Sequence, residues 1–138
     1  MADFNWVNLR AKCSLAEVFE QLRLDVKADV EHRQGLRASE DADKYAHAFH
    51  VSGNRNMFAV VLRGHYTKGG SVTFSLEKDC IAVSGEKDDL LFRVNVTLNS
   101  EGRCIAKIAG EEVELWQVRQ KALESLFFET DVPFNTPA

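Results

Sequence analysis

The sequence lacks the short motifs that identify nucleotide-binding proteins, metalloproteases and serine hydrolases. It contains no G-x-G-x-x-G, no G-x-x-x-x-G-K-[ST], no H-E-x-x-H and no G-x-S-x-G. The acidic run 40–43 lacks the ligand pattern of a calcium loop, and His47 and His50 project from opposite faces of a predicted strand. The sequence therefore predicts no cofactor and no metal ion, and it favours a non-enzymatic function.

Concentrated positive charge and long apolar runs are absent as well. The 17 Lys and Arg residues are scattered among 21 Asp and Glu, and the formal net charge is -4. Nucleic-acid binding needs a concentrated basic surface, and interfacial membrane helices favour Lys and Arg on their polar faces. No apolar run approaches the ~20 residues of a membrane span, and the first residues do not resemble a signal peptide. We therefore expect a cytoplasmic protein that binds neither nucleic acid nor membranes.

Cysteine is scarce. Cys13, Cys80 and Cys104 form no C-x-x-C pair, and an odd number cannot all be paired within one chain. The odd count favours reduced thiols. Because no neighbouring base is visible for Cys80 or Cys104, small buried hydrophobic residues are a better interpretation than nucleophiles.

Proline is scarce. The two prolines, Pro133 and Pro137, both lie at the C-terminal end. A chain of 138 residues is close to the commonest size for one domain, and neither a repeat nor a linker divides it. We predict a single domain over 1–138, with an N-terminal segment at 1–13 and a tail at 129–138.

A first helix is predicted over 14–34. The residues from Ser14 to Glu17 have the form of a capping box, and apolar residues then recur at three- and four-residue spacing until Gly35, a plausible stop. Residues 24–33 also alternate as in a strand, an ambiguity that the sequence leaves open. The abundance of good helix formers favours the helix.

The segment 45–109 has the two-residue periodicity of β-strands, broken by turn-forming residues. A second amphipathic helix is predicted over 112–128, where Trp116 and Phe127 share the apolar row. The fold class is therefore α+β: an N-terminal helix, a six-stranded antiparallel meander, curved or partly closed into a barrel, and a C-terminal helix packed on its apolar face. The six predicted strands cover 45–51, 57–66, 72–77, 80–85, 92–98 and 104–109.

Polar residues of two predicted strands form the first candidate binding site. The residues are Arg63, His65, Tyr66 and Arg93. A hairpin around 68–70 would bring Arg63 and His65 close to Thr73 and Ser75, and the arginines could bind an acidic group. The alternative is that Arg63 and Arg93 form solvated cross-strand pairs with acids of an exposed sheet face.

Aromatic residues near the two chain ends form the second candidate site. Trp6, Phe128 and Phe134 have no obvious place in a minimal core, so they could anchor a partner. The alternative is that they pack as a terminal plug.

Two functions compete on this evidence. The first is a non-enzymatic protein-binding or adaptor module that presents its sheet face or helical edge to another protein or to a second copy of itself. The second is a small-molecule-binding domain, with or without catalysis, whose apolar pocket lies between the sheet and the C-terminal helix. The pocket would be lined by Phe74, Val83, Phe92, Val94 and Trp116.

Overall fold

A computed structural model describes residues 5–40, 48–63 and 68–129. The chain begins with two helices, α1 (Trp6–Lys12) and α2 (Leu15–Glu40), and ends with a third, α3 (Leu115–Glu124), that continues into a π-helical turn, η2 (Ser125–Glu129). Seven strands lie between the second and third helices. They are β1 (Ala48–Gly53), β2 (Met57–Arg63), β3 (Lys68–Leu76), β4 (Ile81–Ser84), β5 (Leu90–Leu98), β6 (Cys104–Ile108) and β7 (Glu111–Val113).

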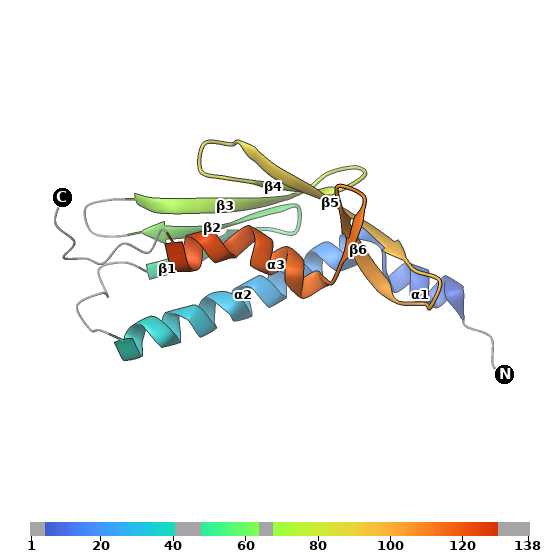
Figure 1. The fold of residues 1–138 in the computed structure, drawn as a ribbon, viewed down its shortest axis with the longest axis horizontal. Coiled ribbons are helices and arrows are strands. Elements are labelled where there is room, and N and C mark those ends of the chain that lie inside the picture. The colour runs from blue at the N-terminus through green and yellow to red at the C-terminus, as the bar shows by residue number, and fades with distance from the viewer. Residues whose placement is uncertain (1–4, 41–47, 64–67, 130–138) are drawn as a thin grey trace.

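The predicted fold class is confirmed. The strands follow one another across a single sheet in the order β1-β2-β3-β4-β5-β6-β7, and every neighbouring pair is antiparallel. Helices α2 and α3 lie side by side on one face of this sheet and run in the same direction (Figure 1). The sheet has seven strands rather than the predicted six, and it stays open instead of closing into a barrel.

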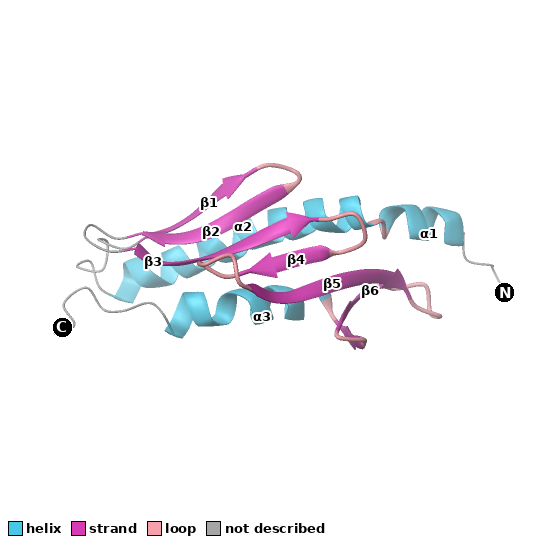
Figure 2. Cartoon of the chain, turned by 90° about the horizontal axis from the view of Figure 1, so that it is seen from above, coloured by secondary structure: helices cyan, strands magenta, loops and turns pink. Residues whose placement is uncertain are grey.

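Strand β5 turns the sheet. Its first half, as far as Val94, pairs with β4, whereas its second half, from Asn95, pairs with β6. Strand β5 therefore pairs with a different neighbour along each half of its length. As a result β6 lies at an angle to β3 and β4 (Figure 2). The bend brings the last hairpin round the start of α3.

The core lies between the sheet and the two helices. In β2, Phe58, Val60 and Leu62 are buried, and they alternate with residues of the other face, as expected for a sheet covered on one side. The Phe58 ring stacks on Phe74 of β3 at 4.7 Å between centroids and meets Phe19 of α2 at 5.2 Å. These ring contacts tie the first long helix to the centre of the sheet.

The N-terminal part is more helical than predicted. The segment 1–13, expected to be irregular, contains α1, and Gly35 does not end α2, which continues to Glu40. Ser14 caps α2 as expected, since its Oγ accepts a hydrogen bond from the Glu17 backbone N–H at 3.2 Å. Residues 24–33 are helical, which resolves the ambiguity. Although α2 has 26 residues, no helix in the described ranges is long and apolar enough to cross a membrane.

The predicted helix over 112–128 begins too early. Glu111 and Val113 belong to β7, which is joined to β6 by the two residues Ala109 and Gly110, with φ of 54° and 83°. Two consecutive positive φ angles are typical of a tight hairpin turn. Because alanine rarely adopts such angles, the sequence carried no recognisable turn signal here.

The predicted turn at 68–70 is also wrong, because these residues begin β3. The register places Ala59 opposite Thr73 and Met57 opposite Ser75, while Arg63 lies opposite Lys68. Arg63 is therefore several residues away from the neighbours that the sequence predicted for it.

Two cysteines that the sequence predicted to be reduced thiols form a disulfide. Cys13, between α1 and α2, is bonded to Cys104 at the start of β6, with a Cα–Cα distance of 5.4 Å. An odd cysteine count leaves one thiol over but does not prevent the other two from pairing, and Cys80 is the one left as a thiol. Helix α1 has no buried residue, so this covalent link is a major part of what holds it in place.

Candidate functional site

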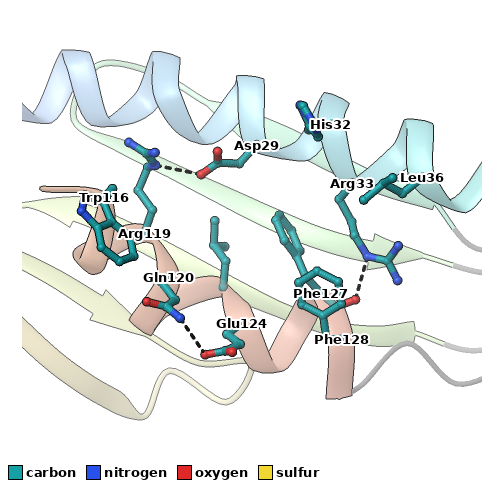
Figure 3. A pocket seen from close by; sticks show the side chains of 11 residues that line it. Asp29, His32, Arg33, Leu36, Trp116, Arg119, Gln120, Glu124, Phe127 and Phe128 are labelled. Atoms are coloured by element: carbon teal, nitrogen blue, oxygen red, sulfur yellow. Dashed lines mark hydrogen bonds and ion pairs between the residues drawn. The ribbon is translucent and has the colours of Figure 1, made fainter.

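A groove of about 340 Å³ runs between α2 and α3. Its walls are the facing sides of the two helices, and its floor contains the buried side chains of Leu123 and Phe127 (Figure 3). The groove lies on the helical side of the molecule, away from the sheet. The two neighbouring helices both pack against the sheet, and the groove is the space left between them.

Two arginines, one from each helix, link the walls. At one end Arg119 of α3 reaches α2, with Nε 2.8 Å from Asp29 Oδ2 and Nη1 3.4 Å from Asp25 Oδ2. At the other end Arg33 of α2 reaches η2, where its Nε–H donates to the backbone carbonyl of Phe127 at 2.9 Å. Charge-assisted hydrogen bonds are stronger than neutral ones, so these links hold the helices at a fixed separation.

Large apolar side chains stand at both ends of the groove. Trp116 is 53% exposed at the Asp29 end, and Phe128 is 61% exposed at the Arg33 end, both from the α3 side. The guanidinium of Arg33 lies 4.7 Å from the Phe128 ring centroid, a cation–π contact that orients the ring. Leu36 of α2, 47% exposed, completes the apolar surface at this end.

Two adjacent phenylalanines in the π-helical turn point in different directions. In η2, Phe127 is 7% exposed and its ring meets Phe49 of β1 edge-on at 5.0 Å, whereas Phe128 faces out. A π turn contains more residues than an α turn and so changes which side chains face the core. The prediction that Phe127 lies in the core and Phe128 does not is confirmed.

Trp116 does not lie in the core, contrary to the prediction. The buried residues of α3 are Val118, Ala122 and Leu123, and the row that they form leaves Trp116 at the rim of the groove. The groove as a whole was missed because Leu36 follows Gly35, where the first helix was expected to end. The available signal was the Phe127-Phe128 doublet, since one of two adjacent helical residues must face outward.

The predicted polar sheet site is only partly visible. His65 and Tyr66 lie outside the described residues, and of Arg63 only the backbone is described. Arg93 is exposed on β5, and its Nε lies 3.9 Å from Glu77 Oε1 with both side chains about half exposed. This pair matches the solvated cross-strand alternative, while anion binding at this face stays a prediction.

The predicted aromatic anchors are separated. Trp6 is 65% exposed on α1, away from the groove, Phe128 lines the groove, and Phe134 lies outside the described residues. The structure therefore places one of the three predicted anchors in the candidate site.

The predicted apolar pocket is mostly filled. Phe74, Val83 and Val94 are buried in the core. A separate hollow of about 410 Å³ lies between α3 and the sheet, and Phe92 and Lys121 are among its lining residues. Lys121 Nζ lies 5.5 Å from the centroid of the Phe92 ring.

Reactive groups are not assembled in the described part of the chain. Burial raises the pKa of the Cys80 thiol, and its hydrogen bond to Glu77 acts in the same direction, so the nucleophilic thiolate is disfavoured. Among the described residues, no three His, Cys, Asp or Glu side chains come together as metal ligands would. The α2–α3 groove can bind an apolar surface, and the titratable side chains of His32 and Glu124 are among its lining residues.

No protein-family model, curated protein or solved structure matches the chain. The geometry of the α2–α3 groove therefore carries the functional argument.

Proposed function

We propose that this protein is a non-enzymatic protein-binding module and that the α2–α3 groove is its binding surface. The observation that carries the proposal is the pair of half-exposed aromatic side chains, Trp116 and Phe128, at the two ends of a groove with a buried apolar floor. Tryptophan and other large aromatic residues are enriched among the few residues that dominate binding energy at protein interfaces.

The energetics favour an apolar occupant. Moving a large apolar side chain from water to a buried site contributes about 1.5–3 kcal/mol, and Trp116, Phe128 and Leu36 are each about half exposed. Because the arginine links already fix the groove walls, little ordering cost is added on binding. Because the groove is preformed, more of the free energy gained by burying apolar side chains remains as binding free energy.

The shape suits a helical surface. Trp116 and Phe128 are twelve residues apart, which at the rise of an α-helix is about 18 Å, or a little over three turns. An amphipathic helix can place apolar residues along such a groove at i, i+4 and i+7. The sequence-based expectations of a protein partner and of no binding to nucleic acid or membranes remain part of this proposal. The Cys13–Cys104 disulfide favours an oxidising compartment over the cytoplasmic location that the sequence predicted.

Photo-crosslinking from the groove tests the proposal. A benzoylphenylalanine at position 120, where Gln120 lines the groove, should form an adduct with a bound polypeptide in cells. The adduct should be lost with Leu36→Ala and kept with Leu24→Ala. The two leucines are a matched pair, because both lie on α2 and both are 47% exposed, but only Leu36 lines the groove.

Either of two results would overturn the proposal. If position 120 forms no polypeptide adduct, or if Leu36→Ala and Leu24→Ala reduce the adduct equally, the groove is not the binding surface. Circular dichroism of both variants would verify that the fold is intact, which is expected because both side chains are half exposed.

The hollow between α3 and the sheet favours a second candidate, a small-molecule-binding domain. It has an apolar wall at Phe92 and Leu126 and polar groups at Lys121 and Ser125. A thermal-shift screen of small molecules separates the two functions, because a tight ligand raises the melting temperature by linkage. A shift abolished by a change at Ser125 and unaffected by Leu36→Ala would favour this second candidate over the α2–α3 groove.

A further inference from the structure

We propose that the hollow between α3 and the sheet binds a small carboxylate whose remaining part is apolar. The inference rests on the second candidate function and names its class of ligand. The volume of the hollow is about 410 Å³. Small-molecule sites span roughly 300–1,000 Å³, so this hollow suits a ligand with one ring or a short chain.

Two β-bulges border the hollow. In β5, Leu91 is an extra residue that has no opposite partner in β4. Neighbouring residues of a regular strand face opposite sides of the sheet, yet Leu91 and Phe92 both line the hollow. In β3, Gly69 is the extra residue of the pairing with β2, and its neighbour Gly70 lines the hollow. The bulges therefore direct strand residues toward the hollow that regular pairing would not.

The helical wall of the hollow contains a third irregularity. The π-helical turn η2 begins at Ser125, and both Ser125 and Leu126 line the hollow. Single π turns occur frequently at functional sites, and β-bulges are over-represented next to active sites. Three departures from regular backbone geometry, in β3, in β5 and at the end of α3, thus meet at one place. Their convergence is the observation that marks the hollow as a binding site.

One ammonium group gives the hollow its charge preference. Lys121 of α3 is exposed, and its Nζ lies 5.5 Å from the centroid of the Phe92 ring, a cation–π contact. Within the described ranges, no ion pair joins Lys121 to a carboxylate. Glu86, the other charged residue of the described lining, has an interaction of its own within the chain. The positive charge of Lys121 is therefore available to a ligand.

The two donors of the helical wall match a carboxylate. Ser125 follows Lys121 by four residues and still has α-helical φ and ψ angles of -64° and -42°, so the two side chains are neighbours on one side of the helix. An ammonium group only donates hydrogen bonds, and a serine hydroxyl can donate one. Two adjacent donors, one of them charged, suit the two oxygens of a carboxylate. The described lining contains no arginine, the residue that most often binds phosphate through two parallel hydrogen bonds.

Matched probes test the class of ligand. Phenylacetate and phenylacetamide have nearly the same size and shape but differ in charge, as do hexanoate and hexanamide. NMR titrations of the whole chain should show binding in roughly the millimolar range, with each carboxylate about tenfold tighter than its amide. The backbone amide signals that shift should belong to the segments that line the hollow, 70–72, 85–92 and 121–126.

A lysine variant tests the charged contact. Lys121→Gln should weaken the binding of both carboxylates about tenfold and leave the amides unchanged, because it removes the ammonium group alone. Lys27→Gln, at an exposed lysine of α2 outside the hollow, should change neither. Equal effects of the two variants would overturn the role of Lys121.

Two adjacent leucines test the apolar contact. Leu90 and Leu91 are 46% and 47% exposed, but only Leu91 lines the hollow. Leu91→Ala should weaken the carboxylates and the amides alike, because both share the apolar part. Leu90→Ala should leave all four dissociation constants unchanged. Since both side chains are about half exposed, both variants should fold, which their NMR spectra verify.

The results separate the class of ligand from the second candidate function. Equal affinity for carboxylates and amides at the hollow, insensitive to Lys121→Gln, supports a small-molecule site and overturns the carboxylate. If no probe binds there but the thermal-shift screen yields a ligand that depends on Ser125, the class of ligand alone is overturned. If neither experiment yields a ligand, both are overturned. Shifts confined to the lining of the α2–α3 groove would likewise contradict the hollow as the site.

Discussion

The chemistry of the buried Cys80 thiol differs from that of a thiol in water. The thiol is buried next to β4, and its Sγ lies 3.4 Å from Glu77 Oε1. We expect the native protein, without reductant, to react slowly with a thiol reagent such as dithionitrobenzoate, and the denatured protein to show one reactive thiol. Three reactive thiols in the denatured protein would contradict the Cys13–Cys104 disulfide.

The raised pKa of Cys80 also predicts how stability changes in alkali. Burial raises the pKa above its ordinary value of 9.0. When the pH rises past 9.0, the unfolded chain loses this proton first and is stabilised, so the free energy of unfolding falls until the pH exceeds the folded-state pKa. Urea denaturation between pH 7 and 10 should show a steeper loss of stability for the wild type than for Cys80→Ala. Parallel profiles would be inconsistent with the shift.

Two glycines should respond to alanine in opposite directions. Gly53, at the β1–β2 turn, has a φ of 135°, and a β-carbon there would collide with the Met57 carbonyl oxygen. Gly53→Ala should therefore lower the free energy of unfolding by about 1–3 kcal/mol. Gly35→Ala, in helix α2 with open space around it, should raise stability by about 0.5–1 kcal/mol. Equal effects of the two changes in chemical denaturation would refute this account.

Residue by residue, the sequence predicted burial better than exposure. Phe127 was identified from periodicity, which reports the face that meets the core. Trp116 was assigned to the core because it falls on the same apolar row. Periodicity cannot show where one helix meets a second helix instead of the sheet, and that is the position at which Trp116 becomes exposed.

At the scale of elements, α1 depends on its covalent link. None of its residues is buried, and Cys13 at its C-terminal end is bonded to Cys104 in β6, 91 residues away in sequence. The double variant Cys13→Ser, Cys104→Ser should lose about 2–4 kcal/mol of stability. Hydrogen exchange should accelerate in α1 more than in α3. Uniform acceleration across the chain would indicate a purely global effect of the disulfide.

The elements that the sequence missed share a physical cause. Strand β7 is only three residues long and follows a turn that contains Ala109 instead of the usual Asn or Gly at its first position. Helix α2 passes through Gly35 because one glycine costs a helix about 1 kcal/mol, less than tertiary packing can supply. In both cases interactions between elements outweigh the local preference of single residues, and these interactions are not encoded in a short window of sequence.

At the scale of the whole molecule, the layers determine where a partner can bind. One face of the open sheet packs against α2 and α3, and the helical layer is one helix pair wide (Figure 2). The order and direction of the strands could be predicted because short connections favour antiparallel neighbours. The α2–α3 groove could not, since it depends on the spacing of two helices that are about 75 residues apart in the chain, and that spacing is set by Arg33 and Arg119.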